Sequence, residues 1–274
     1  MEYNLPKLPK RPENSNKGTF GKVLNIAGSD YMPGAGYLSS ISALKTGAGY
    51  VELLSTEKVL TAVSHLAPEI VLVPTKELNK VIKEATVISI GCGLSTSQET
   101  AELFKNVLNL KSDKPIIIDA DGLNILSEIE YDFDKKAILT PHPKEASRLL
   151  GCTLEEILSN VQNSAVKISK KYNCITVLKI HDTIVTEGKT VYKNTTGNSA
   201  LAKAGSGDVL CGMITGLVAQ GMDLFDASAL SVYLHGLTGE LASKDLTKYS
   251  VLATDQIKYI PNAIKHMQLY YECA

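Results

Sequence analysis

Short apolar runs rich in β-branched residues recur along the chain, and stretches with helical periodicity separate most of them. Each run spans only a few residues between turn-forming positions, which is typical of buried strands. The expected strands lie at 22–27, 50–54, 70–73, 86–90, 115–119, 137–139 and 175–178. The expected helices between them lie at 35–46, 57–65, 96–110, 143–150 and 154–171. This alternation predicts βαβ units and an α/β fold with a largely parallel sheet.

The pattern changes after residue 178. Residues 183–193 predict a β-hairpin, and only helical patterns follow it, at 207–221, 225–243 and 254–268. Residues 1–17 contain several prolines and no periodicity, so we expect an extended N-terminal arm packed on the domain or on a neighbouring subunit. Because no segment has the composition of a linker, we expect a single domain over residues 1–274.

Composition and charge exclude several classes of protein. The chain has 28 Lys and Arg against 29 Asp and Glu, and a net charge of -1 gives no electrostatic basis for binding nucleic acid or a membrane surface. No apolar run reaches the ~18 residues of a membrane span, and the N-terminus lacks a leader pattern. The cysteines show no CxxC spacing, which favours a reducing cytoplasm over a disulfide framework or a zinc site. They are Cys92, Cys152, Cys174, Cys211 and Cys273.

The segment 195–208 carries the strongest functional signal. It is a run of small residues that ends in Asp208, directly before an apolar helical pattern at 209–219. Small residues let backbone N–H groups approach an anion, and a helix start adds free donors and a positive dipole end. An aspartate repels phosphate, so we interpret Asp208 as a general base or a metal-linked group that faces the reacting atom. The segment therefore predicts a phosphoryl-handling site; the alternative is a flexible loop capped by Asp208.

Glycines and carboxylates follow several predicted strand ends, where parallel sheets place their ligands. Gly91 and Gly93 leave space for a ligand or form a tight turn. Asp119 can hold Mg²⁺ through water or orient a polar ligand, whereas Asp121 also suits a helix N-cap. The glycines around the first strand lack GxGxxG spacing, so a classical dinucleotide-binding fold is not indicated.

Two basic side chains also follow strand ends. His142 stands between Pro141 and Pro143, which fix its backbone on the presumed functional edge, so it is a candidate binding residue. Lys179 ends a strand and either meets a phosphate or belongs to a polar hairpin tip.

Together these motifs resemble the ribokinase-like superfamily, and their order is similar to that of the NAD(P)H-hydrate dehydratase family over about residues 17–245. The motifs are Lys17-Gly18-x-x-Gly21, Gly34-Ala35, Gly91-x-Gly93, Asp119-Ala-Asp121-Gly-Leu-Asn124, Thr140-Pro-His142-Pro-Lys-Glu145 and Gly205-Ser-Gly207-Asp208. The resemblance implies a three-layer sandwich in which helices flank a mostly parallel central sheet.

The resemblance also implies an activity. It points to a hydro-lyase that uses ADP to dehydrate the S epimer of NADH hydrate and NADPH hydrate, with release of AMP and phosphate. The Thr196-Gly197-Asn198 form of the loop resembles the standalone branch that uses ADP, with ATP as the alternative co-substrate. Mg²⁺ is implied as cofactor, NAD(P)H-hydrate epimerase as functional partner, and a homo-oligomer, a tetramer, as the assembly. No epimerase segment precedes the arm at 1–17, so we expect that activity on a separate protein.

Carried over by position, the resemblance assigns residues to the two ligands. The hydrate is assigned to Ala35, Gly93, His142 and Asp208, with Asp208 as the catalytic base. The nucleotide is assigned to Lys179, Ile180, His181, Asp182, Thr183, Asn198, Gly205, Ser206 and Gly207. No motif fixes metal ligands. The chain departs from the family at Ile180, where Gly is usual, at Cys92, where Pro is usual, and at Lys203 and Ala204.

Two other functions fit part of the pattern. A small-molecule kinase of the same superfamily, acting on a vitamin precursor alcohol, would share the Asp208 base and the anion-binding loop but would keep the phosphorylated product. A nucleotide-binding regulatory protein without turnover has no need of an aspartate directly after that loop. The Thr140-to-Glu145 motif and the Gly91-x-Gly93 turn favour the dehydratase.

Overall fold

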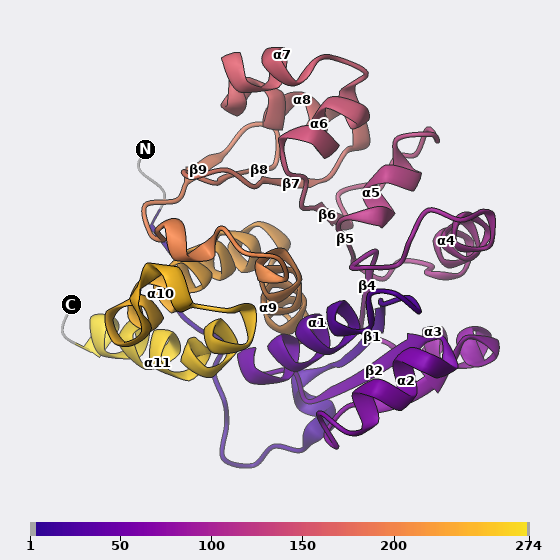
Figure 1. The fold of residues 1–274 in the computed structure, drawn as a ribbon, viewed down its shortest axis with the longest axis horizontal. Helices are drawn as coiled ribbons and strands as arrows, with labels where there is room; N and C mark the ends of the chain where they lie inside the picture. Colours follow the sequence, from indigo (N-terminus) through magenta and orange to yellow (C-terminus); the bar gives the residue numbers. More distant parts are fainter. Residues whose placement is uncertain (1–3, 273–274) are drawn as a thin grey trace.

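A nine-stranded sheet forms the centre of the protein, of which the computed structural model describes residues 4–272 (Figure 1). The strand order is β3-β2-β1-β4-β5-β6-β7-β8-β9. The strands are β1 Lys22–Ile26, β2 Tyr50–Ser55, β3 Val71–Pro74, β4 Val87–Ile90, β5 Ile116–Ile118, β6 Ala137–Leu139, β7 Ile175–Leu178, β8 Ile184–Thr186 and β9 Val191–Lys193. Strands β1 to β7 are parallel and β8 and β9 are antiparallel, which confirms the parallel sheet and the terminal hairpin.

Helices cover both faces of the sheet. They are α1 Pro33–Thr46, α2 Glu57–Ser64, α3 Leu78–Glu84, α4 Gln98–Leu110, α5 Asp121–Leu126, α6 Pro143–Leu150, α7 Leu154–Ser159, α8 Val161–Tyr172, α9 Ser206–Ala219, α10 Leu224–Ser250 and α11 Ala253–Glu272. One apolar cluster joins the sheet to α1, α2, α9, α10 and α11, and a second joins its other face to α3 through α8. Figure 1 shows α1, α9, α10 and α11 gathered on one side. This arrangement is the expected three-layer sandwich.

The central strands are apolar at every position because both of their faces are covered. All three residues of β5 are fully buried, and its Ile118 pairs with Ile90 of β4 and Leu139 of β6. Continuous apolar runs of this kind are typical of parallel sheets between two helix layers. The carboxyl ends of β1, β4, β5, β6 and β7 therefore meet along one edge, where open parallel sheets place their ligand sites.

The structure differs from the expected helices in four places. The helix expected at 154–171 is divided at Asn160, whose backbone leaves the helical region and whose side chain caps α8 at Asn163 N. Helices α3 and α5 were not predicted, because each spans fewer than two turns, too short for a repeating apolar face to be recognised. Helix α10 continues beyond residue 243, with a kink at Thr247, where φ is 66°.

The N-terminal arm packs on the domain, which was one of the two expectations for it. The Arg11 guanidinium lies 3.6 Å from the centre of the Phe20 ring and donates to the Gly47 carbonyl. Residues 1–3 of the expected arm and Cys273 lie outside the described residues. Within residues 4–272, no helix has both the length and the apolar character that crossing a membrane requires.

Candidate active site

The site lies where the strand ends of the parallel sheet meet the start of α9. Backbone hydrogen bonds join the loops that follow neighbouring strands: Gly28 N donates to Cys92 O at 2.8 Å, and Lys179 N donates to Pro141 O at 2.8 Å. A Cβ added to Gly207 would lie 3.5 Å from Lys179 Nζ, so the first turn of α9 faces the end of β7. The fold thus brings the predicted motifs together at one edge.

Helix α9 begins with a turn whose backbone could bind an anion. Its N-cap is Gly205 at φ 88°, a backbone region that side chains rarely adopt. A Cβ there would lie 2.7 Å from Leu38 Cδ1, so both conformation and space require glycine. No side chain among the described residues caps the first turn. Ser206 N donates to Lys203 O at 3.2 Å, which leaves the amides of Gly207 and Asp208 as the donors that could receive a phosphate, in line with the prediction for this segment.

Asp208 lies in that first turn and is largely buried. Burial and the nearby Asp119 raise the pKa of Asp208 to about 6, although Cys92 and Lys179 oppose the increase. A carboxylate that is poised near neutral pH and faces a ligand site is suited to accept a proton from a hydroxyl.

Lys179 and Asp119 form an ion pair beneath the anion-binding turn. Lys179 Nζ lies 2.5 Å from Asp119 Oδ1, and the two side chains are 19% and 2% exposed. Burial alone would lower the pKa of Lys179, but Asp119 and Glu145 raise it, so the lysine stays charged. The position of Lys179 near Gly207 favours contact with a phosphate over a bare hairpin tip, and Asp119 holds the lysine in place.

His142 caps α6, and its ring is 44% exposed toward the site edge. Its Nδ1 accepts hydrogen bonds from the amides of Lys144 and Glu145, which leaves the proton of the neutral ring on Nε2. Glu145 Oε2 accepts from His142 N at 2.8 Å and completes a capping box. Burial, followed by the charge of Lys179, lowers the pKa of His142, so the ring is neutral at physiological pH.

Glu145 was not predicted as a site residue. Burial raises the pKa of its carboxyl to about 7, with Asp119 adding to the increase and Lys179 opposing it. Its Oε1 lies 3.3 Å from His142 Nε2, so a protonation event at Glu145 directly affects the ring. The sequence contained a signal for it, since a capping box places a glutamate three residues after the cap.

Gly93, in the turn after β4, and Ala35, in the first turn of α1, lie against each other. A Cβ on Gly93 would lie 2.6 Å from Ala35 Cβ and 3.1 Å from Met32 Cβ, and Gly93 has φ 60°. The turn after β4 can therefore approach the start of α1 only with glycine at this position. The structure brings together the positions assigned to the hydrate on these two elements, and their contact with the hydrate stays a prediction.

The β7–β8 turn carries the other positions assigned to the nucleotide. His181 Nδ1 lies 2.8 Å from Asp182 Oδ1, whose other oxygen pairs with Lys193 at 2.8 Å. Thr183 Oγ1 donates to Ile180 O at 3.0 Å and closes the turn. Thr183 is buried, whereas Ile180 and Asp182 are half-buried and His181 is exposed. The turn can therefore contact a base or ribose mainly through its backbone and its exposed side chains.

Two predicted nucleotide residues use their side chains within the protein. Asn198 Oδ1 accepts from Ala200 N at 2.9 Å, and its Nδ2 donates to Ser243 Oγ at 3.0 Å. Ser206 Oγ lies 3.1 Å from His235 Nε2 and donates to Gln256 Oε1 at 3.0 Å. We therefore expect Asn198 and Ser206 to contact the nucleotide through their backbone atoms, which these hydrogen bonds hold in place.

His235 and Gln256, which support Ser206, were missed by sequence reasoning. Burial lowers the pKa of His235 to about 4, so the ring is neutral. These side chains come from α10 and α11 and tie both helices to the anion-binding turn. No spacing rule connects positions this far apart.

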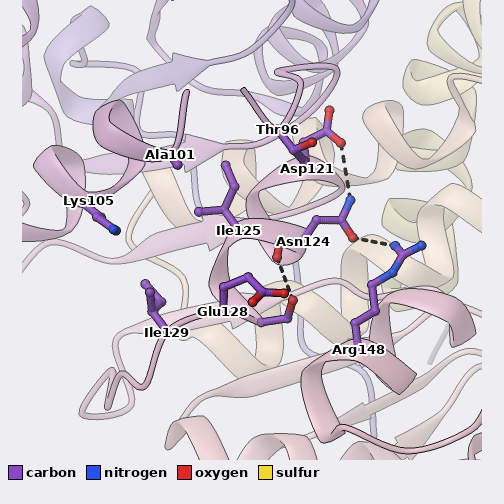
Figure 2. Close-up of a pocket in the computed structure, with 10 residues that line it drawn as sticks. Thr96, Ala101, Lys105, Asp121, Asn124, Ile125, Glu128, Ile129 and Arg148 are labelled. Carbon is purple, nitrogen blue, oxygen red and sulfur yellow. Dashed lines mark hydrogen bonds between the residues drawn. The ribbon is translucent and has the colours of Figure 1, made fainter. Parts of the chain in front are cut away.

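A pocket of about 530 Å³ lies beside the site, between α4, α5 and α6 (Figure 2). Asp121 does not cap α5 as expected: its Oδ2 accepts from Ser95 N at 2.7 Å. Asn124 donates to Asp121 Oδ1 at 3.4 Å and accepts from Arg148 Nη1 at 2.7 Å, so the three residues form a polar wall in Figure 2. The pocket contains none of the residues assigned to the hydrate or the nucleotide.

Comparisons with known proteins agree on one family. The family model described as NAD(P)H-hydrate dehydratase matches residues 23–262. The ADP-dependent (S)-NAD(P)H-hydrate dehydratase of Bacillus subtilis is 32% identical over 276 residues, with 97% of each chain covered. That of Neisseria meningitidis is 38% identical over 238 residues, covering 84% of this chain and 80% of its own. A bifunctional NAD(P)H-hydrate repair enzyme of Thermofilum pendens is 32% identical over 99% of this chain, which spans only 55% of that relative.

Solved structures support the same relationship. The B. subtilis ADP/ATP-dependent NAD(P)H-hydrate dehydratase, co-crystallised with ATP/Mg²⁺, matches with a TM-score of 0.85 at 31% identity, over 95% of each chain. A hydroxyethylthiazole kinase from Pyrococcus horikoshii matches with a TM-score of 0.66 at 15% identity, over 91% of this chain and 92% of its own, which shows a shared ribokinase-like fold alone. From the matched family model and relatives, together with the arrangement of the motifs, this chain belongs to the NAD(P)H-hydrate dehydratase family.

Proposed function

We propose that this protein dehydrates the S epimer of NADH hydrate and NADPH hydrate, with ADP converted to AMP and phosphate. The observation that carries the proposal is Asp208, a partly buried carboxyl with a pKa of about 6 in the uncapped first turn of α9. The proposal assigns this group to the point at which a substrate hydroxyl and a terminal phosphoryl group meet.

The chemistry begins with activation of the hydroxyl group. The hydrate carries it on the carbon next to the ring nitrogen, and hydroxide is a poor leaving group. Asp208 takes the hydroxyl proton while the oxygen attacks the terminal phosphoryl group of the nucleotide. The O–H bond and the phosphoanhydride bond break, a C–O–P linkage forms, and AMP leaves. Ala35, Gly93 and His142 hold the hydrated ring during this step.

Charge on the transferring phosphoryl group needs compensation from the protein. The amides of Ala204, Gly205 and Gly207 at the start of α9 supply fixed donors for the phosphoryl oxygens, whereas the amide of Ser206 already donates to Lys203 O. Lys179, held by Asp119 near Gly207, adds a cation at the same place. The turn at 179–183 and the backbone near Asn198 hold the remainder of the nucleotide.

Elimination then restores the dihydropyridine ring. The lone pair of the ring nitrogen expels phosphate, and the adjacent ring carbon loses a proton to phosphate or water. The two steps together remove one water from the hydrate and add it across the phosphoanhydride of ADP, so atoms and charge balance.

Mg²⁺ is expected to enter with the nucleotide. Asp119 is already paired with Lys179, and Asp121 accepts from a backbone amide and from Asn124. Within residues 4–272, the one group of three potential metal ligands contains two thiols, which do not suit Mg²⁺. The described residues therefore do not form an oxygen cage for this ion, and phosphate oxygens and water are its proposed ligands.

The finer aspects of the assignment are also proposals. We infer that an NAD(P)H-hydrate epimerase supplies the S epimer, since several relatives are bifunctional repair enzymes about twice as long as the matched part. ADP is the proposed co-substrate because two relatives are named as ADP-dependent enzymes. From the same family resemblance, we also propose that the protein is a homo-oligomer, specifically a tetramer, and that it is located in the cytoplasm.

The decisive experiment follows absorbance of the restored dihydronicotinamide. The purified chain is incubated with NADH hydrate, Mg²⁺ and either ADP or ATP, and Asp208→Asn serves as the matched control. We expect recovery with the wild-type chain, faster with ADP. Phosphorylation of hydroxyethylthiazole without any recovery would instead identify a kinase, and nucleotide binding without either reaction would identify a regulatory protein.

A further inference from the structure

Three buried side chains with metal-binding atoms meet beside Asp208. Cys92 lies in the turn after β4, Asp119 directly follows β5, and Cys211 is on α9. One ligand atom from each residue lies within 4.8 Å of the other two. The residues are 1%, 2% and 1% exposed, respectively. Sequence spacing had argued against a zinc site, but the fold joins thiols that are far apart along the chain.

The spacing of these atoms is close to that of a tetrahedral metal site. Cys92 Sγ donates to Asp119 Oδ2 at 3.7 Å. Zn–S bonds of about 2.3 Å and Zn–O bonds of about 2.0–2.2 Å give tetrahedral edges of about 3.5–3.8 Å. The longest separation in the group, up to 4.8 Å, needs to shorten by only about 1 Å, which a change of thiol rotamer supplies. Asp208, whose pKa responds to both Cys92 and Asp119, is the nearby carboxyl that could complete the site as a fourth ligand.

The buried charge favours exchange of two protons for a divalent cation. In the protein alone, Lys179 and Asp119 offset each other. A divalent cation that displaces both thiol protons creates two thiolates and brings two positive charges, so the net buried charge is unchanged. Such exchange avoids the cost of an unpaired buried ion.

We propose that Cys92, Cys211 and Asp119 form a binding site for Zn²⁺ or a similar thiol-seeking divalent cation, with Asp208 as the fourth ligand. Binding releases two protons to solvent and forms two metal–thiolate bonds. The thiolates select a borderline-soft cation over Mg²⁺. Inhibition follows, because a coordinated Asp208 no longer accepts a proton; this part alone rests on the proposed function.

Cobalt(II) provides a direct test of ligation. The full chain, kept reduced with a phosphine, is titrated with Co²⁺ and then with Zn²⁺. We expect a near-ultraviolet thiolate-to-cobalt band and strong visible bands of a tetrahedral site, both abolished by Zn²⁺. Absence of the thiolate band from the wild-type chain would overturn the proposal without any variant.

Variants identify the ligands. We expect Cys92→Ser and Cys211→Ser to lose the thiolate bands and to bind Zn²⁺ at least about 100-fold more weakly. Cys174→Ser is the matched control, since Cys174 is also buried but contacts Thr176, outside the site. Cys211→Ala is used if a serine variant does not fold, as judged by circular dichroism. Wild-type affinity in folded variants at both positions would refute the ligand assignment.

Activity gives a separate readout. The ratio of turnover with and without Zn²⁺ is measured for each variant in excess Mg²⁺, followed by a zinc-selective chelator. We expect reversible inhibition in the wild-type and Cys174→Ser chains and resistance in Cys92→Ser. Thiolate bands without inhibition of an active enzyme would refute Asp208 as a ligand. If no dehydratase activity is found at all, the proposed function fails while the cobalt spectrum still decides the metal site.

Discussion

Replacing Asp208 by Asn separates catalysis from stability. The amide preserves the size of the side chain but cannot accept the hydroxyl proton, and loss of a positioned general base costs about 10²–10⁴-fold in rate. In the wild-type enzyme, a base with a pKa of about 6 is mostly ionised at pH 7 and mostly protonated at pH 5. We therefore expect kcat/KM to fall about tenfold between pH 7 and pH 5, and this dependence to vanish in the residual activity of the variant.

The same substitution is expected to stabilise the fold. Burial raises the pKa of Asp208 from 3.8 to about 6, so the folded state holds a proton that the unfolded state releases between these pH values. The free energy of unfolding consequently decreases as pH rises through this window, and the ionised carboxylate costs the fold up to about 3 kcal/mol above it. Partial exposure reduces this to about 1–2 kcal/mol. The Asp208→Asn variant lacks the penalty, so its Tm should be about 2–6 °C above that of the wild type at pH 8.

Thermal unfolding at pH 8 and pH 5, turnover by absorbance, and nucleotide affinity by calorimetry test these statements together. The stability gain should shrink by about half at pH 5, because most wild-type Asp208 is then protonated. Nucleotide affinity should be retained or tightened, because a negative charge near the phosphates is removed. Turnover near the wild-type rate would rule out Asp208 as the base. A variant with a lower Tm at pH 8 would refute the assigned effect of burial.

Three further substitutions probe the remainder of the site. His142→Ala should raise the KM for the hydrate about tenfold or more without weakening nucleotide binding. His142→Asn, which keeps the helix cap, is the control for lost capping. A wild-type KM in both variants would show that His142 is not part of the hydrate-binding site. Lys179→Met should cost about 3–5 kcal/mol in urea unfolding because Asp119 is left buried and unpaired. Adding Asp119→Asn should restore stability but not nucleotide affinity in calorimetry, and recovered affinity would contradict a phosphate contact by Lys179. In Gly207→Ala the added methyl group has room, since it would lie 3.5 Å from Lys179 Nζ, so the Tm should be unchanged. The methyl group would obstruct a phosphate at this position, so kcat/KM should fall about tenfold or more. A wild-type kcat/KM would show that no phosphate approaches Gly207.

The sequence could predict the sheet and the edge that carries the site, because both depend on local patterns. Apolar runs such as 116–118 fit only strands that are covered on both faces. Parallel strands then place the residues that follow them at one edge, which is why Asp119, His142 and Lys179 could be selected from their positions alone. The small-residue run before Asp208 likewise predicted an uncapped helix start.

Side-chain pairing was beyond the sequence, since it depends on the packing of distant elements. The Lys179–Asp119 ion pair joins residues 60 positions apart, and the bond between Ser206 and Gln256 spans 50. Asp121 shows the same limit on a smaller scale. Its position favoured a helix cap, but an amide of the neighbouring loop, at Ser95, lies closer in space and takes its carboxylate.

The two halves of the site are fixed relative to each other by close packing of α1 against α9. A Cβ on Gly212 would overlap the carbonyl oxygen of Ser39, and a Cβ on Gly216 would lie 2.6 Å from that of Ala43. Residues four apart share one face of a helix, so these contacts pair the two helices turn by turn. Extended by one turn toward the start of each helix, the same pairing predicts that Asp208 lies opposite Ala35. The proposed base and the proposed hydrate-binding residue therefore face each other at a separation set by glycines deeper in the interface. A larger side chain at those glycines would move the base away from its substrate without altering any residue that contacts it.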